Sequence, residues 1–478
     1  MYRKKTKIVA TLGPSCNTPE VIRQMILEGV NVFRINFSHA NYDDVIDKIN
    51  IIRTLNTELN THVALLADLQ GPKLRVGIMQ PNTIVEEGKQ ITFSTKATDK
   101  ELIGTKDLVY MNYSNFPKDV KIGEKILLDD GKLIFEVIST NDNDKVIAQV
   151  IQGGGLNSKK GVNLPNTNVS LPALTKKDKQ DALFAIQNNV DWIALSFVRS
   201  SKDLEELQDF ISEHSDHKIP IIAKIEKPEA IDNIDQIVAY SDGLMVARGD
   251  LGVEIPAHEV PLIQKRLVNR AKTARIPVII ATQMMESMLT SLTPTRAEVN
   301  DVANSVMDGA DAVMLSGETS VGQYPIEVVR KMTQIIQSVE DSPLIQVPQN
   351  IPRTKTKRYI TKLICYHAAS MATQIQASAI CTLTNSGYTA FQISAWRPQS
   401  RILVFTSNKR ILTQMSLLWG VDSMYYDKYV STDDTVDDVN KMSKEFGYVQ
   451  SGDLVINLAA MPIHEKGMVN TLRVSEIK

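Results

Sequence analysis

Eight short aliphatic runs recur along the chain, and segments with helical spacing separate them. Runs of this length and composition are typical of buried strands, and their alternation with helices predicts βαβ units around a parallel sheet. Eight strands are the number that closes into a (β/α)8 TIM barrel. The runs span residues 7–13, 30–37, 62–69, 191–198, 220–225, 243–247, 277–283 and 311–316.

Polar side chains gather at the carboxyl ends of these runs. Active sites of this fold are built from the loops at that end of the barrel. Scattered polar residues would not collect at one end of strand after strand, so we expect a functional rim there. Its members are Arg34, Asn36, Ser38, Asp68, Ser196, Lys224, Glu226, Arg248, Asp250, Thr282, Gln283, Ser316 and Glu318.

The fifth and sixth runs end in paired opposite charges. Lys224 and Glu226 close the fifth run, and Arg248 and Asp250 follow the sixth. Two carboxylates from neighbouring strand ends suit a hard divalent cation such as Mg²⁺, which takes oxygen ligands and keeps waters or substrate phosphates in its other positions. The two cationic side chains would neutralise an anionic substrate. The alternative is a structural ion-pair network at a strand-to-loop boundary.

The barrel pattern is interrupted once and is followed by a third region. Between residues 71 and 170, short alternating runs and Gly or Asp turns predict a small antiparallel β domain, inserted where it would act as a lid. After a polar, Pro-containing connection, further strands and helices predict an independent α/β domain. We therefore expect barrel segments at 1–70 and 171–345, a lid at 71–170 and a C-terminal domain at 346–478.

One loop of the C-terminal domain has the composition of a phosphate site. It lies between a predicted strand and a helix, and its backbone N–H groups and hydroxyls could hold the phosphate of an effector. An ordinary strand-to-helix turn capped by Ser and Thr fits the same residues. The candidate effector residues are Thr384, Asn385, Ser386, Gly387 and Thr389.

The overall composition excludes several classes of partner. Lys and Arg number 53 against 55 Asp and Glu, for a net charge of −2, so no global basic field would recruit nucleic acid or a membrane surface. No apolar run approaches the roughly 18 residues of a membrane span. The cysteines, Cys16, Cys365 and Cys381, lack the spacing of a zinc or redox motif and read as packed thiols of a reducing compartment. We expect a cytoplasmic protein.

The rim motifs follow one another in a specific order: Thr11-Leu-Gly-Pro-Ser15, Arg34-Ile-Asn-Phe-Ser-His39, Gly71-Pro-Lys-Leu-Arg75, Lys224-Ile-Glu226, Arg248-Gly-Asp-Leu-Gly-Val-Glu-Ile-Pro256, Ala281-Thr-Gln-Met-Met-Glu-Ser287, Thr295-Arg-Ala-Glu298 and Met314-Leu-Ser-Gly-Glu-Thr319. In this order they resemble the pyruvate kinase family over essentially the full chain. The resemblance implies a barrel with a mobile β lid, a C-terminal regulatory domain and a homotetramer. It also implies a glycolytic kinase that moves the phosphoryl group of phosphoenolpyruvate to ADP, giving pyruvate and ATP through a Mg-stabilised enolate.

The same resemblance implies roles for individual residues. Glu226 and Asp250 would bind Mg²⁺ or Mn²⁺, and Lys224 would stabilise charge on the transferring phosphoryl group and the enolate. Phosphoryl transfer depends chiefly on positioning and charge neutralisation, so these cations matter most. The other implied roles are a phosphoryl contact from Arg34, a carboxylate clamp of Gly249, Asp250 and Thr282, nucleotide contacts from Asn36, His39, Arg75 and Lys177, and proton delivery by way of Thr282 and Ser316.

One departure from the family pattern concerns a monovalent ion. Many members hold K⁺ with groups that match Asn36, Ser38, Asp68 and the position of Leu69, where they carry Thr, and have Glu at the position of Lys73. An ammonium in place of that acid resembles the K⁺-independent branch, in which the tethered charge would do the work of the ion. We expect Lys73 to lie close to Asp68, Asn36 and Ser38. The alternative is a Lys at the lid hinge that only faces solvent.

Two other functions would use similar residues. A Mg²⁺-dependent barrel lyase or aldolase acting on an enolpyruvate or keto acid would need the same pair of carboxylates but no nucleotide-side lid. A catalytically silent sensor of metabolites would tolerate losses among the rim residues, and the sequence shows none.

Overall fold

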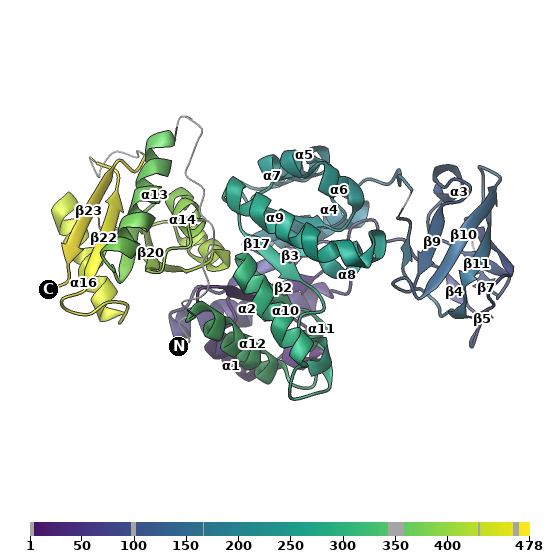
Figure 1. Ribbon diagram of the computed structural model, residues 1–478, viewed down its shortest axis with the longest axis horizontal. Coiled ribbons are helices and arrows are strands. Elements are labelled where there is room, and N and C mark those ends of the chain that lie inside the picture. The colour runs from purple at the N-terminus through teal and green to yellow at the C-terminus, as the bar shows by residue number, and fades with distance from the viewer. Residues whose placement is uncertain (1–3, 97–101, 166, 343–357, 429–430, 462–467) are drawn as a thin grey trace.

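Three bodies lie in a row along the molecule. The barrel is in the middle, the inserted β domain is on one side and the C-terminal domain is on the other (Figure 1). The structure is a computed structural model and describes residues 4–96, 102–165, 167–342, 358–428, 431–461 and 468–478. The predicted boundary between barrel and C-terminal domain, at residue 345, falls outside these ranges.

Eight parallel strands close into a barrel, as predicted, in the order β1-β18-β17-β16-β15-β14-β3-β2. Each strand lies within the run predicted for it. The strands are β1 (Lys7–Thr11), β2 (Val32–Asn36), β3 (Ala64–Asp68), β14 (Trp192–Leu195), β15 (Ile221–Ile225), β16 (Gly243–Ala247), β17 (Val278–Ala281) and β18 (Ala312–Leu315).

Helices surround the barrel, and several begin at caps that the sequence encodes (Figure 1). Thr295 and Glu298 form a capping box at the start of α10, and Thr18 caps α1, which ends at Gly29 with a φ of 118°. The elements are η1 (Pro14–Cys16), α1 (Pro19–Glu28), α2 (Tyr42–Leu59), α4 (Lys176–Gln187), α5 (Ser201–His214), α6 (Pro228–Asp232), α7 (Ile234–Tyr240), α8 (Arg248–Glu254), η2 (Ala257–Glu259), α9 (Val260–Ala274), η3 (Glu286–Leu289), α10 (Arg296–Asp308), α11 (Gly317–Ser320) and α12 (Pro325–Glu340).

The inserted domain has an apolar core of its own and a sheet of order β13-β9-β10-β11-β6-β8. One pairing in this sheet differs from the predicted antiparallel pattern, because β6 and β8 run parallel. The connection of residues 95–107 is long enough for the crossover that parallel neighbours need. The elements are β4 (Ile78–Met79), β5 (Ile84–Val85), β6 (Gln90–Ser94), β7 (Ile103–Gly104), β8 (Leu108–Tyr110), α3 (Phe116–Asp119), β9 (Lys125–Leu128), β10 (Leu133–Thr140), β11 (Lys145–Gln152), β12 (Gly154–Gly155) and β13 (Val162–Asn163).

The two chain segments that enter and leave the inserted domain are tied together at its base. Asp178, fully buried in the first turn of α4, accepts a bond from its own N-cap residue, Thr175, and a 3.0 Å bond from the N–H of Gly71. Gly71 has a φ of 70°, and a Cβ there would lie 2.8 Å from the ring of Phe197. Only glycine therefore fits this hinge without strain.

The C-terminal domain is a five-stranded sheet of order β21-β20-β19-β22-β23, with β23 antiparallel to β22. Leu417 from this domain enters the apolar interior of the barrel, and Trp192 in β14 donates its Nε1–H to the carbonyl of Gln414. The domain therefore closes the amino end of the barrel, opposite the rim. Its elements are α13 (Tyr359–Gln374), β19 (Ala379–Leu383), α14 (Tyr388–Ser394), β20 (Arg401–Thr406), α15 (Lys409–Gln414), η4 (Met415–Leu417), β21 (Val421–Tyr425), α16 (Thr432–Glu445), β22 (Leu454–Ala459) and β23 (Thr471–Glu476).

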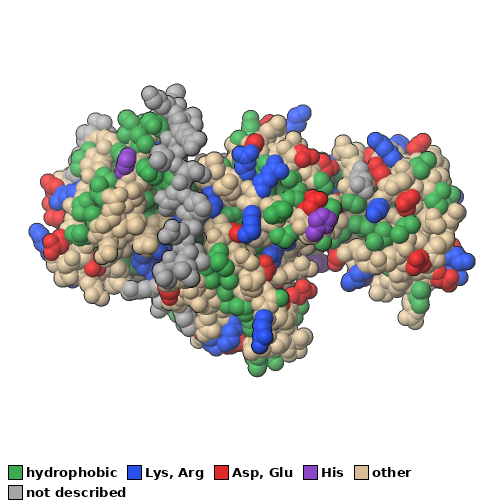
Figure 2. Space-filling view, viewed as in Figure 1, with side chains coloured by type: hydrophobic (Ala, Val, Ile, Leu, Met, Phe, Trp, Pro, Cys, Tyr) green, Lys and Arg blue, Asp and Glu red, His purple; other side chains and the backbone are tan. Residues whose placement is uncertain are grey.

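The surface carries mixed charge. On the face seen in Figure 2, basic and acidic side chains are interspersed over all three bodies. Cys16, Cys365 and Cys381 are buried and form no disulfide, as expected for packed thiols. Within the described ranges, no helix combines the length and the apolar composition required to cross a bilayer.

Candidate active site

The ammonium of Lys224 is the centre of the rim. Its Nζ donates a 2.8 Å hydrogen bond to Oγ of Ser196 and forms ion pairs with Oδ1 of Asp68 and Oε1 of Glu226, each at 3.1 Å. Burial alone would lower the pKa of Lys224, but the Asp68 and Glu226 carboxylates outweigh burial and raise it above the usual value. Lys224 is therefore a fixed positive charge at neutral pH.

Asp68 joins this cation to a second one. Its Oδ2 accepts a 2.6 Å bond from Nε of Arg34, whose Nη1 donates to the hydroxyl of Thr11 at 3.1 Å. Burial would raise the pKa of Asp68, but Arg34 and Lys224 hold it below its usual value. The carboxylate thus stays ionised and aligns two cations beside each other.

Glu226 and Asp250 follow adjacent strands, β15 and β16, and are the two carboxylates predicted to hold a divalent cation. Glu226 is 1% exposed, and its Oε2 accepts a 2.7 Å bond from the N–H of Phe197. Burial raises the pKa of Glu226 above its usual value; Lys224 opposes this shift and Asp250 adds to it. A cation shared by the two carboxylates would stabilise the ionised form of Glu226 and offset both its burial and its repulsion by Asp250.

The donor set fits Mg²⁺ or Mn²⁺. No cluster of three or more His, Cys, Asp or Glu side chains suited to a metal occurs among the described residues. Two carboxylates alone are an incomplete ligand set, which suits a hard ion that completes its shell with water and substrate oxygens.

Arg248 does not take the role predicted for it. We expected it to neutralise an anionic substrate beside Lys224. Instead its Nη1 donates to Asp301 at 2.7 Å and its Nη2 to the carbonyl of Thr282 at 2.7 Å. Its guanidinium joins the loop after β17 to α10, because the two ends of this planar group donate to one acceptor in each.

The loop after β17 is bent. Thr282 and Gln283 have φ values of 69° and 54°, a region that residues other than glycine rarely adopt. The bend brings the Thr282 hydroxyl to the N–H of Gly249, which donates to it at 2.7 Å, while the hydroxyl donates to the carbonyl of Ala281. The two residues predicted as a carboxylate clamp, Gly249 and Thr282, are thus in contact.

Ser316 and Glu318 lie at the end of β18. The Ser316 N–H donates to Oε2 of Glu318 at 2.7 Å, and the Met285 N–H donates to its Oε1 at 3.1 Å. Burial raises the pKa of Glu318 above its usual value. This carboxyl fixes the position of Ser316 relative to the loop after β17.

The residues predicted to contact a nucleotide lie in two places. Asn36 is the last residue of β2 and His39 lies in the loop after it, and Lys177 of α4 reaches the same loop, donating to the carbonyl of Phe37 at 2.8 Å. Arg75 belongs to the inserted domain, where its guanidinium donates to the carbonyl of Lys159 at 3.0 Å. The two groups come from opposite sides of the lid hinge.

The Lys73 ammonium faces one of the two carboxylates predicted to hold the divalent cation. Its one ion pair among the described residues is with Oδ1 of Asp250, at 4.0 Å, whereas both oxygens of Asp68 face Arg34 and Lys224. The side chain of Leu69 is buried in the barrel core, so this position offers a carbonyl but no hydroxyl.

The candidate effector loop has two exposed residues, Asn385 and Ser386. The Thr384 hydroxyl accepts a bond from the N–H of Gly387, which has a φ of 77°. Thr389 is 4% exposed, and its hydroxyl accepts from Thr382 inside the domain.

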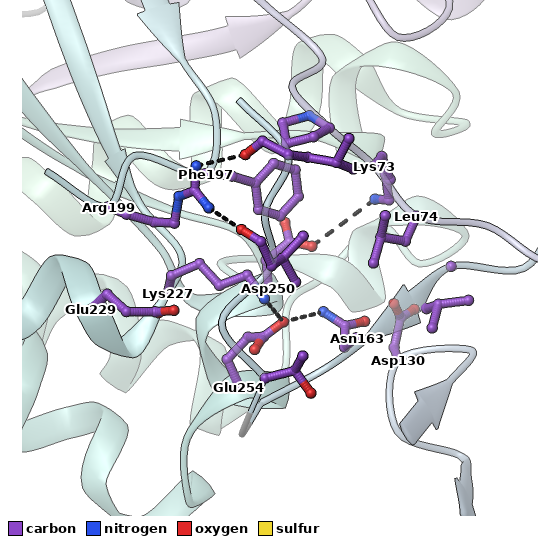
Figure 3. A pocket seen from close by; sticks show the side chains of 16 residues that line it. Lys73, Leu74, Asp130, Asn163, Phe197, Arg199, Lys227, Glu229, Asp250 and Glu254 are labelled. Carbon is purple, nitrogen blue, oxygen red and sulfur yellow. Dashed lines mark hydrogen bonds and ion pairs between the residues drawn. The ribbon is translucent and has the colours of Figure 1, made fainter. Parts of the chain in front are cut away.

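Three contributions to the site were not predicted from the sequence. Ser196 was expected only as a rim residue, yet it orients Lys224, and its own hydroxyl donates to the carbonyl of Leu69 at 2.7 Å. The N–H of Phe197 reaches Glu226 because its φ is 55°, which no side-chain pattern reveals. The ion pair of Lys227 and Glu254, drawn in Figure 3, borders the carboxylates of Glu226 and Asp250. In the sequence, Lys227 and Glu254 are only two charged residues that follow these carboxylates, and nothing indicates that they pair.

Comparisons with known proteins match the whole chain. A family model described as the barrel domain of pyruvate kinase matches residues 3–329, and one described as its alpha/beta domain matches 362–475. A pyruvate kinase of Mycobacterium intracellulare is 40% identical over 476 residues, covering 99% of this chain and 98% of that protein. One of Bacillus licheniformis is 41% identical over 473 residues, 98% of this chain and 80% of that protein. The crystal structure of a pyruvate kinase from Cryptosporidium parvum has a TM-score of 0.90 at 32% identity, covering 100% of this chain and 97% of its own.

Replacing Lys224 by Met should destabilise the protein more at about pH 8 than at about pH 5. Breaking a buried ion pair typically costs about 3–5 kcal/mol. Without the ammonium, the pKa of Glu226 would rise further, and a carboxyl with a raised folded-state pKa loses stability as pH rises through that pKa. Thermal unfolding of both proteins at the two pH values measures the difference. Lys132→Met, which removes a 71% exposed partner of Asp129, is the control; equal losses at both pH values for Lys224→Met would contradict the electrostatic account.

Proposed function

The chain belongs to the pyruvate kinase family, and we propose that its barrel rim transfers the phosphoryl group of phosphoenolpyruvate to ADP, giving pyruvate and ATP. The observation that carries this assignment is the Lys224 ammonium held between Asp68 and Glu226, with Asp250 in the first turn of α8, directly after the neighbouring strand β16. The lyase or aldolase alternative is not favoured, because the kinase relatives match the chain along its full length, lid included.

The reaction brings two highly anionic substrates together, so the site must supply positive charge in fixed positions. Lys224 and Arg34 supply it from β15 and β2, and Asp68 aligns both. Lys224 stabilises charge that develops on the transferring phosphoryl group and on the enolate left behind. Arg34 contacts the phosphoryl group. Their donors are oriented before substrate arrives, which avoids reorganisation during the reaction.

Glu226 and Asp250 hold the divalent cation, Mg²⁺ or Mn²⁺, which the family generally requires. When bound, this ion supplies charge neutralisation between the substrate oxygens. The two carboxylates follow adjacent strands, β15 and β16, and Glu226 is buried. They are the only two carboxylate ligands that we assign to the ion.

Gly249, Asp250 and Thr282 bind the substrate carboxylate. The N–H of Gly249 rests on the Thr282 hydroxyl, and a substrate carboxylate is a stronger acceptor for that N–H than a neutral hydroxyl. Thr282 and Ser316 stand at neighbouring strand ends, β17 and β18, from which a hydroxyl or a water chain delivers the proton that converts the enolate to pyruvate.

The nucleotide binds between the barrel and the lid. Asn36, His39 and Lys177 contact it from the barrel, and Arg75 contacts its phosphates from the lid. This division is supported by the attachment of Lys177 to the loop after β2 and by the place of Arg75 beyond the hinge at Gly71. Lid movement would then govern how closely the two groups approach.

The native protein is a cytoplasmic homotetramer. The sheet of the C-terminal domain ends in β23, an edge strand through which a second copy can pair. Three buried thiols that form no disulfide fit a reducing compartment. The mass of the native particle in solution tests the tetramer.

The enzyme should form pyruvate from phosphoenolpyruvate only when ADP and a divalent cation are both present. Asp250→Asn should raise the Mg²⁺ concentration needed for half-maximal rate by more than the roughly 10–100-fold typical of outer-shell changes, because a neutral oxygen attracts a hard dication far less. A coupled assay across Mg²⁺ concentrations measures both. Pyruvate formation without ADP would contradict the phosphotransferase assignment.

K⁺ should not be required for activity. Two features support this. Leu69 is buried at the position where K⁺-dependent members carry the hydroxyl of a Thr. The Lys73 ammonium is 4.0 Å from Asp250, so its positive charge acts from the side of the site that holds the divalent cation. The rate in buffers containing only bulky organic cations should be close to the rate with K⁺. Lys73→Glu reverses a charge beside the reacting phosphates, so it should inactivate the enzyme without K⁺, and K⁺ should restore part of the rate, more so with Leu69→Thr. Strong K⁺ dependence of the unaltered enzyme would make Lys73 a bystander.

A phosphorylated metabolite should activate the enzyme by binding at Thr384, Asn385, Ser386, Gly387 and Thr389. The exposed hydroxyl of Ser386 is the best placed of these, since Thr389 faces the domain interior. Ser386→Glu should abolish activation, because a carboxylate would repel the phosphate. Sugar mono- and bisphosphates are screened against both proteins, with the exposed Ser212→Glu as the control. Activation that survives in Ser386→Glu would place the effector elsewhere.

A further inference from the structure

Glu254, the last residue of α8, lies where the lid meets the barrel. Its Oε1 accepts two bonds, one from Nδ2 of Asn163 in the lid strand β13 at 2.8 Å and one from Nζ of Lys227 in the barrel at 2.7 Å. Figure 3 shows both side chains pointing at this one oxygen from opposite sides. A single carboxylate thus contacts both bodies.

This carboxylate is deeply buried. The side chain of Glu254 is 1% exposed and that of Lys227 is 13% exposed. The second oxygen, Oε2, is also buried and has no hydrogen-bond partner in the part of the chain that the structure describes. The negative charge of Glu254 is therefore stabilised by Lys227 and Asn163. Because the carboxylate has so few partners, losing either one would leave its charge poorly compensated and favour a shift of the side chain.

The position of this ion pair in the chain links it to the metal carboxylates. Lys227 directly follows Glu226, and Glu254 lies one helical turn after Asp250 in α8. The register between β15 and β16 ends at the pair Ile225 and Val246, so no strand pairing holds the segments beyond it. The ion pair of Lys227 and Glu254 joins these two segments past the end of the sheet.

We propose that Glu254 is a positioning residue that sets the separation of the Glu226 and Asp250 carboxylates and couples it to the lid through Asn163. This inference rests on the assignment of those two carboxylates to the divalent cation. Partners that orient metal ligands without touching the metal commonly change metal affinity by about 10–100-fold when removed.

Other lid contacts are made elsewhere. Arg199 of the barrel donates to the carbonyls of Val169 and Leu171 at the lid's return segment, and Lys73 is 4.0 Å from Asp250. A cavity of about 40 Å³ lies among these groups, bordered by both bodies. Among the described lid residues, Asn163 is the one that donates a hydrogen bond to Glu254, so Asn163→Ala removes the link through Glu254 and leaves the contact of Lys73 with Asp250 in place.

The first test is Mn²⁺ binding to the full enzyme without substrate or nucleotide, followed by electron paramagnetic resonance. Lys227→Met/Glu254→Gln should weaken Mn²⁺ binding about tenfold or more. The double change leaves no unpaired buried charge, so it folds more readily than either single variant. Lys227→Arg keeps the ion pair and should bind Mn²⁺ within about twofold of the unaltered enzyme.

Lys218→Met is the matched control. Lys218 pairs with Asp242, which also accepts the N–H of Ile221, so this ion pair joins the same two strands at their opposite ends. A general loosening of β15 against β16 would weaken Mn²⁺ binding in this variant too, whereas positioning by Glu254 predicts no change.

The second test is hydrogen exchange of the lid. Mn²⁺ should slow exchange at the N–H of Val162, which donates to the carbonyl of Leu74 beside Asn163. The slowing should be reduced in Asn163→Ala, which leaves the ion pair of Lys227 and Glu254 and the contact of Lys73 with Asp250 intact, and should persist unchanged in Lys218→Met. Equal slowing in Asn163→Ala would overturn the coupling to the lid.

The metal assignment and the positioning role fail in different ways. If Glu226→Gln binds Mn²⁺ as tightly as the unaltered enzyme, the carboxylate pair is wrongly assigned and the inference falls with it. If Glu226→Gln loses Mn²⁺ but the folded Lys227→Met/Glu254→Gln protein does not, the metal site stands and the positioning role of Glu254 is wrong.

Discussion

The three bonds made by the Lys224 ammonium are the constraint on which the rest of the site depends. They join Asp68 after β3, Ser196 after β14 and Glu226 after β15, three strands that are adjacent in the barrel. The lid is inserted between the first two of these strands, so the ammonium bridges the gap in the chain. A buried cation with three fixed acceptors cannot move without exposing carboxylates to an apolar core. The barrel can therefore carry a mobile insertion at this place and still present a rigid rim.

Several donors of the rim form hydrogen bonds to hydroxyl oxygens. Lys224 donates to Ser196, Arg34 donates to Thr11, and the Gly249 N–H donates to Thr282. A neutral hydroxyl is a weaker acceptor for these groups than a phosphate or carboxylate oxygen. An anionic substrate can therefore exchange with the hydroxyls at small cost, while the bonds to Asp68 keep the cations in place.

Much of this arrangement follows from periodicity and from charge at strand ends. The eight barrel strands and the pair Glu226 and Asp250 were predictable because a parallel barrel puts every strand's carboxyl end on one rim. The role of Arg248 was not, since its partner Asp301 is fifty residues away on α10 and no local pattern joins them. The contact of Lys73 with Asp250 was not predicted, because the angle of an inserted domain on its hinge is a tertiary property. The hydrogen bond from Phe197 to Glu226 could not be predicted from the sequence, because the donor is a backbone N–H, which every residue except proline carries.

The circular order of the strands has a consequence for how the polypeptide is synthesised. β1 lies between β2 and β18, and β18 is made some three hundred residues later. β3 lacks one of its two neighbours until β14 follows the insertion, and β1 lacks one until β18 is made, while the insertion, with its separate core, can already be complete. Parallel pairing over such distances is slow, and an open strand edge emerging from the ribosome invites association with other chains. The fold that aligns the rim so firmly is therefore one that assembles late, and its yield in cells should depend on chaperones that shield the first three strands.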